Sequence, residues 1–365
     1  MSKKKLLITA LVLVALIGLV LRQVRDWHKF DWHTFAAQTE GIHLFFVLLG
    51  VAMIYGDYVL RAWRWKILLR PVWKTSVSRL LAPTMIGFTG LALLGRPGEF
   101  IRPYLIARKE KLSMSSQMAV WTVERIFDTG AFGLIMALNI LISAPTLKQL
   151  PGFQDPAHPK TFSRFEMVGF ALLIGVAFAA WIAFRARKNP ARAARFAERV
   201  LGIISAKLGK SAFHRVHAFG EGLNTIQDVK SFLQLGGLSL LIWLVIGLTY
   251  LSVTHAYGDL ATQMTLSRVL LLTAASVAGG VLQLPVVGGG SQAATIGILF
   301  GIFGLSRELA TSCGIMLWLV TFMSVIPAGL LLAHREHVSL TRLEEESIKE
   351  EEKLESEESG DRIIG

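Results

Sequence analysis

Long apolar runs constrain this chain more than any other feature. They lie near residues 6–21, 42–60, 119–143, 165–184, 231–255 and 309–333. A helix of about 20 apolar residues crosses a hydrocarbon layer about 30 Å thick. With 53% hydrophobic and 18% charged residues, the chain is too apolar for a soluble protein of this length. We therefore predict an all-α polytopic membrane protein with about six full spans, the first of which is not cleaved.

Lysine and arginine gather in three loops and predict the orientation of the spans. Residues 61–79 hold six Lys/Arg, residues 96–117 hold five, and residues 185–230 hold ten. Cytoplasmic loops are enriched in Lys and Arg. We therefore expect these loops and both termini of the chain in the cytoplasm.

Two further apolar regions, 80–99 and 270–304, are broken by glycine and proline. Each has both of its ends on one side in the predicted topology, so we predict that each is re-entrant. Such backbone is tolerated at membrane depth only within protein or beside a water-filled cavity. Their positions predict inverted halves at about 42–143 and 231–333, a pattern that indicates a transport site near the midplane. Chance spacing is the alternative, because the halves share no visible residue-level similarity.

The charge of the chain is unevenly distributed. The formal net charge is +12, yet from His334 onward there are eleven Asp/Glu and five Lys/Arg. We predict a membrane domain over 1–335 and a disordered acidic tail over 336–365. The basic residues adjoin apolar runs, which favours anionic membrane lipid over nucleic acid as the partner. The sequence leaves the oligomeric state open.

The cytoplasmic loop 185–230 contains a further pattern. Apolar side chains recur every four residues from Phe196 through Val200 and Ile204 to Leu208, among basic residues. This spacing predicts an amphipathic helix on the inner leaflet, with a solvated linker helix as the alternative.

The run 119–143 carries three charged residues, Glu124, Arg125 and Asp128. Glu124 and Asp128 are four apart and share a helix face, and Arg125 is positioned to pair with Asp128. A charge at the bilayer centre costs about 2.5–3.5 kcal/mol. The three residues therefore form either a buried ion-pair network that fixes packing or a site for a polar headgroup or a proton.

A second charged motif, GRPGEFIRPYL, spans residues 95–105. Pro97 suits the first turn of a new helix, on which Glu99 and Arg102 are three apart. Arg96 and Arg102 are candidates to hold a lipid phosphate through bidentate hydrogen bonds. The glycines that permit the reversal are Gly95 and Gly98.

The apolar run at 42–60 leads into the sequence DYVLRAWRWK, residues 57–66. Asp57 and Arg61 form an i,i+4 pair. We interpret Arg64, with Lys66, Trp63 and Trp65, as an interfacial belt. The alternative is that Arg61 and Arg64 face a cavity.

The late turn QLPVVGGGSQ, residues 283–292, breaks any helix. Its backbone N–H groups could bind an anion at the start of the next helix, or the turn could serve only to reverse the chain. Its candidate residues are Pro285, Gly288, Gly289, Gly290 and Gln292.

Motifs of catalysis and metal binding are missing from the sequence. There is one cysteine, Cys313, and no Ser/His/Asp set or metal-ligand spacing. We therefore expect no metal, no cofactor and no enzymatic activity. A lipid transporter is the leading hypothesis. A scaffold or accessory subunit of a lipid-modifying complex is the alternative, and a headgroup enzyme is less favoured.

The series RAWRWKILL, GRPGEFIRPYLIARKEKLS, VWTVERIFD and the late LP…GGG turn resembles the lysylphosphatidylglycerol synthase transmembrane-domain family, also called flippase-like. The resemblance implies an inner-membrane protein that moves a phospholipid between leaflets. The family motif positions are occupied here by Arg96, Glu99, Arg102, Glu124, Arg125 and Asp128.

The chain departs from the family pattern in two places. The aminoacyl-transferase domain of the bifunctional members is not expected in the acidic segment after His334, so lysyl transfer is not carried over. Many relatives have a glutamate after the late turn where Gln292 stands here, which places proton coupling through that carboxylate in doubt.

Overall fold

The structure is a computed structural model in which residues 30–157, 159–188, 190–202, 205, 229–280 and 289–338 are described. These residues form helices joined by short turns, and no strand occurs among them. The predicted first span at 6–21 and the acidic tail beyond residue 338 lie outside the described residues.

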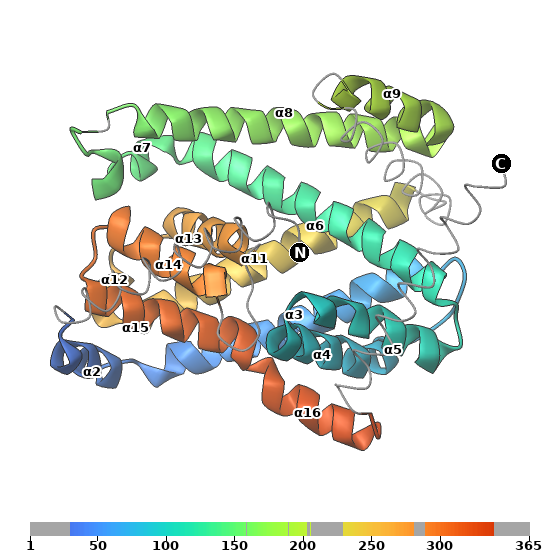
Figure 1. Ribbon diagram of the computed structural model, residues 1–365, viewed down its shortest axis with the longest axis horizontal. Helices are drawn as coiled ribbons and strands as arrows, with labels where there is room; N and C mark the ends of the chain where they lie inside the picture. The colour runs from blue at the N-terminus through green and yellow to red at the C-terminus, as the bar shows by residue number, and fades with distance from the viewer. Residues whose placement is uncertain are drawn as a thin grey trace, which may run out of the picture.

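The first part of the chain is arranged around three long helices (Figure 1). Its elements are α2 (Trp32–Glu40), α3 (Leu44–Leu69), α4 (Val77–Leu94), the 3-10 helix η1 (Arg96–Phe100), α5 (Ile101–Glu110), α6 (Met114–Ile142), α7 (Ala144–Leu147), the 3-10 helix η2 (Pro151–Phe153), α8 (Thr161–Lys188) and α9 (Pro190–Gly202).

The second part begins with one long helix and continues through shorter ones. Its elements are α11 (Val229–His255), α12 (Gly258–Ala261), α13 (Leu266–Gly279), α14 (Gly289–Gly301), α15 (Arg307–Trp318), the π-helical turn η4 (Leu319–Met323) and α16 (Val325–Arg335).

Five of the predicted spans correspond to helices long and apolar enough to cross a membrane, at Leu44–Leu69, Met114–Ile142, Thr161–Trp181, Lys230–His255 and Arg307–Arg335. The all-α polytopic prediction is confirmed. The first of these helices continues nine residues beyond the predicted end at 60, because Arg61, Arg64 and Trp65 are buried against other helices instead of lying at a surface.

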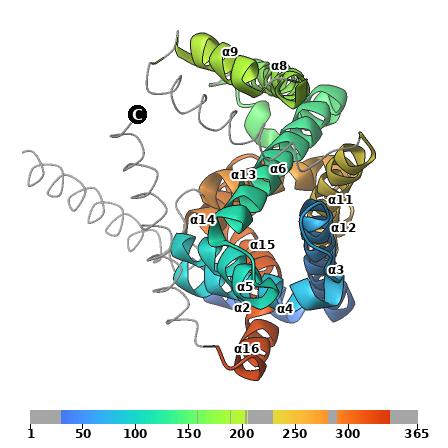
Figure 2. The same cartoon turned by 90° about the vertical axis from the view of Figure 1, so that its right-hand side faces the viewer.

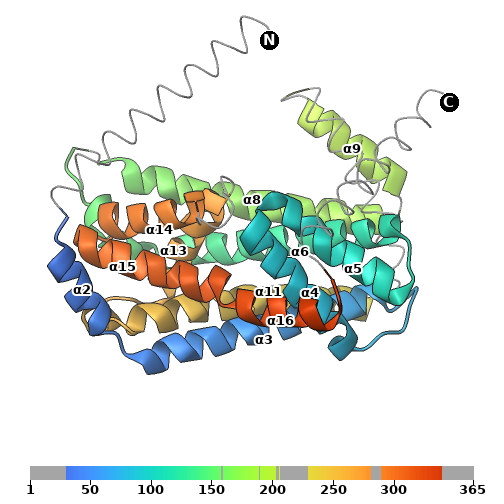
Figure 3. The ribbon, with the colours of Figure 1, turned by 60° about the horizontal axis from the view of Figure 1, so that its bottom comes forward.

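The two halves meet through α3 and α11, which run antiparallel along the molecule (Figure 3). The start of α3 lies beside the end of α11. There the backbone N–H of His43 donates to the carbonyl of Ala256 at 2.9 Å, and the Ser252 hydroxyl donates to the carbonyl of Phe46 at 2.7 Å. The first long helices of the two parts therefore point in opposite directions.

The predicted break at 80–99 is a helical hairpin. The helix α4 runs through Pro83 without interruption and ends at Gly95, whose φ of 75° suits glycine. The chain then returns along α4 through η1 and α5. A Cβ at Gly98 would lie 2.3 Å from the backbone of Gly90, so the two arms touch through bare backbone near the tip.

A carboxylate closes the base of this hairpin. Glu110, at the end of α5, accepts hydrogen bonds from Trp73, Thr75 and Arg79 at 2.8, 3.0 and 2.9 Å. Burial alone would raise the pKa of Glu110. The hydrogen bonds from Arg79, Trp73 and Thr75 outweigh that effect and hold its pKa below the ordinary value. The chain thus returns to the end of the molecule from which α4 began.

The second broken region also forms a hairpin, from α13 and α14. A Cβ at Gly279 would lie 2.1 Å from the carbonyl oxygen of Gly290, so these arms also approach through backbone. Pro285 and Gly288 lie outside the described residues, whereas Gly289, Gly290 and Gln292 begin α14. In Figure 3 the two hairpins lie toward opposite ends of the molecule.

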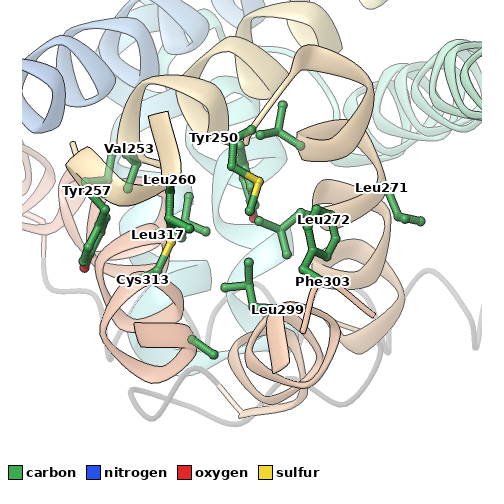
Figure 4. Packing of buried hydrophobic residues seen from close by; sticks show 14 of the residues in the cluster. Tyr250, Val253, Tyr257, Leu260, Leu271, Leu272, Leu299, Phe303, Cys313 and Leu317 are labelled. Atoms are coloured by element: carbon green, nitrogen blue, oxygen red, sulfur yellow. The ribbon is translucent and has the colours of Figure 1, made fainter. Parts of the chain in front are cut away.

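The largest apolar core belongs mainly to the second part. Side chains from α11 to α15 converge there, among them Tyr250, Leu272, Leu299 and the buried Cys313 (Figure 4). Lipid tails are as apolar as these side chains, so van der Waals packing holds the α13–α14 hairpin against α11 and α15.

The helices α8 and α9 lie at one edge of the molecule, and α16 lies at the opposite edge (Figure 2). A helix is present in the basic loop as α9, and Ile204 and Leu208 lie outside the described residues. Its position on the inner leaflet stays a prediction. Its Phe196 packs edge-on against Trp181 of α8, with ring centroids 5.0 Å apart. Part of its apolar face is therefore covered by α8.

Candidate functional site

The two carboxylates of α6 are buried, whereas Arg125 beside them is half-buried. Glu124 is fully buried, and only 5% of Asp128 is exposed. Ser113 starts the helix by accepting a hydrogen bond from the N–H of Ser116. Helix periodicity then places both carboxylates on the face toward α3.

Arg64 of α3 joins these two carboxylates. Its Nη2 donates to Glu124 Oε1 at 2.6 Å and to Asp128 Oδ2 at 3.1 Å, and its Nη1 donates to Asp128 Oδ1. Ser239 of α11 accepts a further hydrogen bond from Nη1 at 2.9 Å. Arg64 is fully buried, so the predicted interfacial belt is wrong for this residue and for Trp65, which is also fully buried.

Arg102 of α5 binds the other side of Glu124. Its Nη1 donates to Glu124 Oε1 at 3.2 Å, and its Nη2 donates to Glu124 Oε2. The guanidinium carbon lies 4.3 Å from the ring centre of Trp65 and 5.5 Å from that of Phe88. Arg102 is thus held within the protein by a carboxylate and two aromatic rings.

The predicted pair of Asp57 and Arg61 is present. Arg61 Nε donates to Asp57 Oδ2 at 2.6 Å, and Arg61 Nη1 lies 3.9 Å from Asp128 Oδ2. The other carboxylate oxygen of Asp57, Oδ1, is buried and has no hydrogen-bond partner among the described residues. A buried acceptor without a partner costs about 1–3 kcal/mol, more when charged.

The predicted pairing of Arg125 with Asp128 is wrong. Asp128 is turned toward Arg64 and Arg61, and the described residues give Arg125 no ion pair. Its guanidinium carbon lies 5.6 Å from the ring centre of Trp121, and its Nε is buried without a hydrogen-bond partner. Arg125 is therefore the cluster arginine whose charge no carboxylate of the described residues balances by direct contact.

A cavity of about 440 Å³ adjoins this cluster. Asp57, Arg61, Arg125 and Asp128 line one part of it. Its other residues come from α3, α4, α6, α11, α13, η4 and α16, so both parts of the chain contribute. Leu91 near the tip of the first hairpin and Gly280 near the tip of the second both line it.

The second part of the chain contributes hydroxyl groups to the cavity in place of charges. Tyr250, Thr273, Ser276 and Thr321 line it. Thr273 and Thr321 donate to the carbonyls of Val269 and Leu317 at 2.8 and 2.7 Å. Ser276 and Thr321 also hydrogen-bond with the side chain of Tyr250, so these hydroxyls bind one another within the wall.

The remaining candidate residues lie outside the ion-pair cluster. Glu99 is half-buried in η1 and makes none of the ion pairs described above. The backbone of Arg96 also lies in η1, and its side chain is outside the described residues. Pro97 occupies the first turn of η1, as predicted. The glycines Gly95 and Gly98 shape the turn and its packing.

Sequence reasoning missed several residues that complete the site. Ser239 binds Arg64, and Phe88 covers both Arg61 and Arg102. These residues lie on helices distant in sequence, so no local spacing could have identified them. The aromatic residues within RAWRWK and GFTG were the available signal, since arginine stacks on aromatic rings.

The comparisons with known proteins agree with the charged motifs and the helical fold. The family profile described as "Lysylphosphatidylglycerol synthase TM region" matches residues 6–329. The chain belongs to this family. The match covers both hairpins and the ion-pair cluster, and it identifies an integral membrane protein linked to lipid handling. No curated protein and no solved structure matches the chain significantly.

Proposed function

We propose that this protein transports a phospholipid between leaflets and that the cavity between the two hairpin tips receives the headgroup. The observation that carries the proposal is a buried cluster of ionised residues that forms part of the wall of a 440 Å³ cavity. Intramembrane charges are expensive and typically mark a substrate path. Family membership supports lipid as the cargo.

Within this proposal the arginines have different roles. Arg125 lines the cavity and has no carboxylate partner among the residues that the structure describes, so it is the first candidate to bind a phosphate, with Arg61 beside it. Arg64 and Arg102 are both held by Glu124. Through these ion pairs, Arg64 and Arg102 hold together the helices that form the cavity wall. This refines the expectation that Arg102 contacts the phosphate directly.

The proposed orientation places the basic loops in the cytoplasm. The end of α3, the base of the first hairpin and α9 all lie toward the same end of the molecule (Figure 1). Each belongs to one of the Lys/Arg-rich loops. Gathering of these loops at one end supports an inner-membrane protein with cytoplasmic basic loops.

We further propose that the hairpins are re-entrant and related as an inverted repeat. The starts of α3, α4, α5 and α6, at 44, 77, 101 and 114, correspond to those of α11, α13, α14 and α15 at 229, 266, 289 and 307. The antiparallel packing of α3 and α11 has the direction that inversion requires. Movement of one half against the other would expose the cavity alternately to the two sides.

Leaflet exchange in proteoliposomes tests the proposal. The purified chain is reconstituted with tail-labelled anionic phospholipid, and quenching of outer-leaflet label follows exchange. Arg125→Gln is the informative variant because its side chain has no ion pair to lose among the described residues. Arg70→Gln is the matched control, since Arg70 is exposed and does not line the cavity.

We expect wild type and Arg70→Gln to accelerate exchange, and Arg125→Gln to be at least about tenfold slower. Equal rates for Arg125→Gln and wild type would contradict the role of the cavity. Background exchange by wild type, together with capture of a stoichiometric protein partner, would favour a scaffold instead.

A further inference from the structure

We propose that the acidic segment 344–358 of this chain docks on a basic surface at the base of the first hairpin. This hairpin-base surface consists of Lys74, Arg108, Lys109 and Lys111. The segment holds nine Glu and two Lys, a net charge of −7, and it lies outside the described residues. Docking requires only that the segment enters from the same end of the molecule, so it is independent of lipid transport.

The hairpin-base surface gathers four basic side chains where α5 ends. Arg108, Lys109 and Lys111 come from the last turn and the C-cap of α5. Lys74 comes from the turn before α4, which the hydrogen bonds of Glu110 tie to the end of α5. Lys74, Arg108 and Lys111 are exposed, and the described residues give none of them an ion pair. Glu110 is buried and paired elsewhere, so the surface is positively charged.

The chain that follows α16 is turned toward this surface. His337 has a φ of 52°, a left-handed conformation that costs energy for residues other than glycine. The turn allows the N–H of Val338 to donate to the carbonyl of Ala333 at 2.9 Å. Val338 also packs against an apolar cluster that includes Ala333 and Leu105 of α5. The last described residue is therefore held against the first hairpin and does not lead away from it.

The first acidic residue after α16 already makes a contact of the proposed kind. Glu336 forms an ion pair with Lys109, and their side chains are 34% and 27% exposed. An ion pair as exposed as this one stabilises only weakly. Its position matters more than its strength, because it places the start of the acidic part of the chain beside the hairpin-base surface.

The connection is long enough for the segment to reach the other charges. Glu344 follows Val338 by six residues, which span up to about 20 Å when extended. Lys111 follows Leu105 by six residues, and helix rise separates them by about 9 Å. A short flexible connection gives an effective concentration in the millimolar range. The glutamates therefore meet the surface far more often than a free acidic peptide would.

Docking would make the acidic segment a competitor of the membrane for these basic side chains. Lys and Arg beside a membrane attract the anionic headgroups of the cytoplasmic leaflet. The segment supplies the opposite charge from within the chain. Contacts between exposed charges require no fixed conformation, so docking agrees with the disorder that the composition of the segment predicts.

Disulfide crosslinking of the full chain tests this docking. Ser115→Cys and Ser347→Cys place one cysteine beside the surface and one in the segment, and both changes keep every charge. Ser115 is exposed and follows Lys111 by four residues. The native Cys313 is buried, and chains with only one added cysteine measure its background. The rate of intramolecular crosslinking is measured in zwitterionic bilayers and in bilayers that contain anionic lipid.

A charge-neutral segment separates docking from random collision. Glu344→Gln, Glu345→Gln and Glu346→Gln together keep the length of the segment and should slow crosslinking at least about threefold. Raising the salt concentration from about 0.01 M to about 1 M shortens the screening length from about 30 Å to about 3 Å. It should slow the acidic chain to the rate of the neutral one. Equal rates for the two chains at low salt would overturn the proposal.

Paired substitutions test whether the hairpin-base surface is the site. Arg108→Gln with Lys111→Gln should slow crosslinking by a similar factor. Lys148→Gln with Lys160→Gln is the matched control, since both residues are exposed and lie at the opposite end of the molecule, around α7 (Figure 1). The control should leave the rate unchanged. Equal slowing by both pairs would mean that only net charge matters and would overturn the surface as the site.

The lipid composition distinguishes the segment from the membrane as the occupant. We expect crosslinking in both kinds of bilayer, with a lower rate where anionic lipid competes. Crosslinking that disappears in bilayers with anionic lipid would assign the hairpin-base surface to the inner leaflet and overturn the proposal.

Discussion

The two hairpins share a backbone plan and differ in chemistry. Each is closed by glycines so tight that a Cβ would meet backbone, at Gly98 in the first and Gly279 in the second. The first half surrounds its hairpin with buried ions, whereas the buried polar residues described in the second half are all uncharged. The two hairpins are therefore alike in their backbone packing, and the buried charges described in the structure belong to the first half.

The two halves therefore contribute different groups to the cavity. The first half supplies an ionic wall of Asp57, Arg61, Arg125 and Asp128. Behind it, Glu124 is shared by Arg64 and Arg102. The second half supplies hydroxyls and the largest apolar core. A buried ion network is expensive to disturb, so we expect its residues to respond to substitution far more strongly than the hydroxyls.

The largest effect is expected from Glu124→Gln. The change leaves the buried Arg102 without its carboxylate and removes one of the two carboxylates that hold Arg64, and it should destabilise the protein by about 3–5 kcal/mol. Unfolding in detergent, followed by tryptophan fluorescence, measures this loss. A loss below about 1 kcal/mol would mean that the ionic wall is not a structural unit.

Alanine substitution at the closest glycine of each hairpin should destabilise the protein to a similar extent in both hairpins. Gly98→Ala and Gly279→Ala each force a Cβ against backbone, and each should cost about 1–3 kcal/mol or more. Gly130→Ala is the control, since a Cβ there meets nothing within 4 Å. It should be neutral or slightly stabilising in the same unfolding assay. If only one of Gly98→Ala and Gly279→Ala destabilises the protein, the two hairpins are not closed in the same way.

The base of the first hairpin should respond to pH. The pKa of Glu110 is lowered in the folded protein, so its stabilising effect is fully present above the ordinary value of 4.5 and is lost as the pH falls through the lowered value. Glu110→Gln removes this contribution. Thermal unfolding from pH 6 to pH 3 should therefore show a smaller loss of stability in the variant than in wild type. Parallel curves would contradict the prediction.

The smallest loss of stability is expected from substitution of a hydroxyl group in the second half. Ser276 and Ser291 share a hydrogen bond of 2.6 Å, and Ser276→Ala should cost about 1 kcal/mol or less. The same unfolding assay measures it beside Glu124→Gln. A cost comparable with that of Glu124→Gln would erase the contrast between the two halves.

Much of the fold was predictable because apolar length and charge position are local signals. Five spans and both reversals follow from runs of apolar residues and from glycine and proline. The i,i+4 pair of Asp57 and Arg61 and the shared face of Glu124 and Asp128 follow from helix periodicity alone.

The partners of the charged residues were less predictable, because they lie on different helices. Local spacing paired Arg125 with Asp128, but packing of α3 against α6 brings Arg64 to Asp128 instead. The same packing buries Trp65, which a sequence pattern places at an interface. Composition identifies a tryptophan beside arginines but does not distinguish a membrane surface from the core of a bundle.

Photo-crosslinking of lipid tests the central claim most directly. An anionic phospholipid with a photoreactive group beside its phosphate is reconstituted with the full chain, and the labelled peptides are identified by mass spectrometry. We expect labelling of cavity residues on α6 and α11, near Thr129 and Trp243, and its reduction by Arg125→Gln but not by Arg70→Gln. Labelling confined to the outer faces of the helices, unchanged in Arg125→Gln, would contradict a headgroup site between the hairpins.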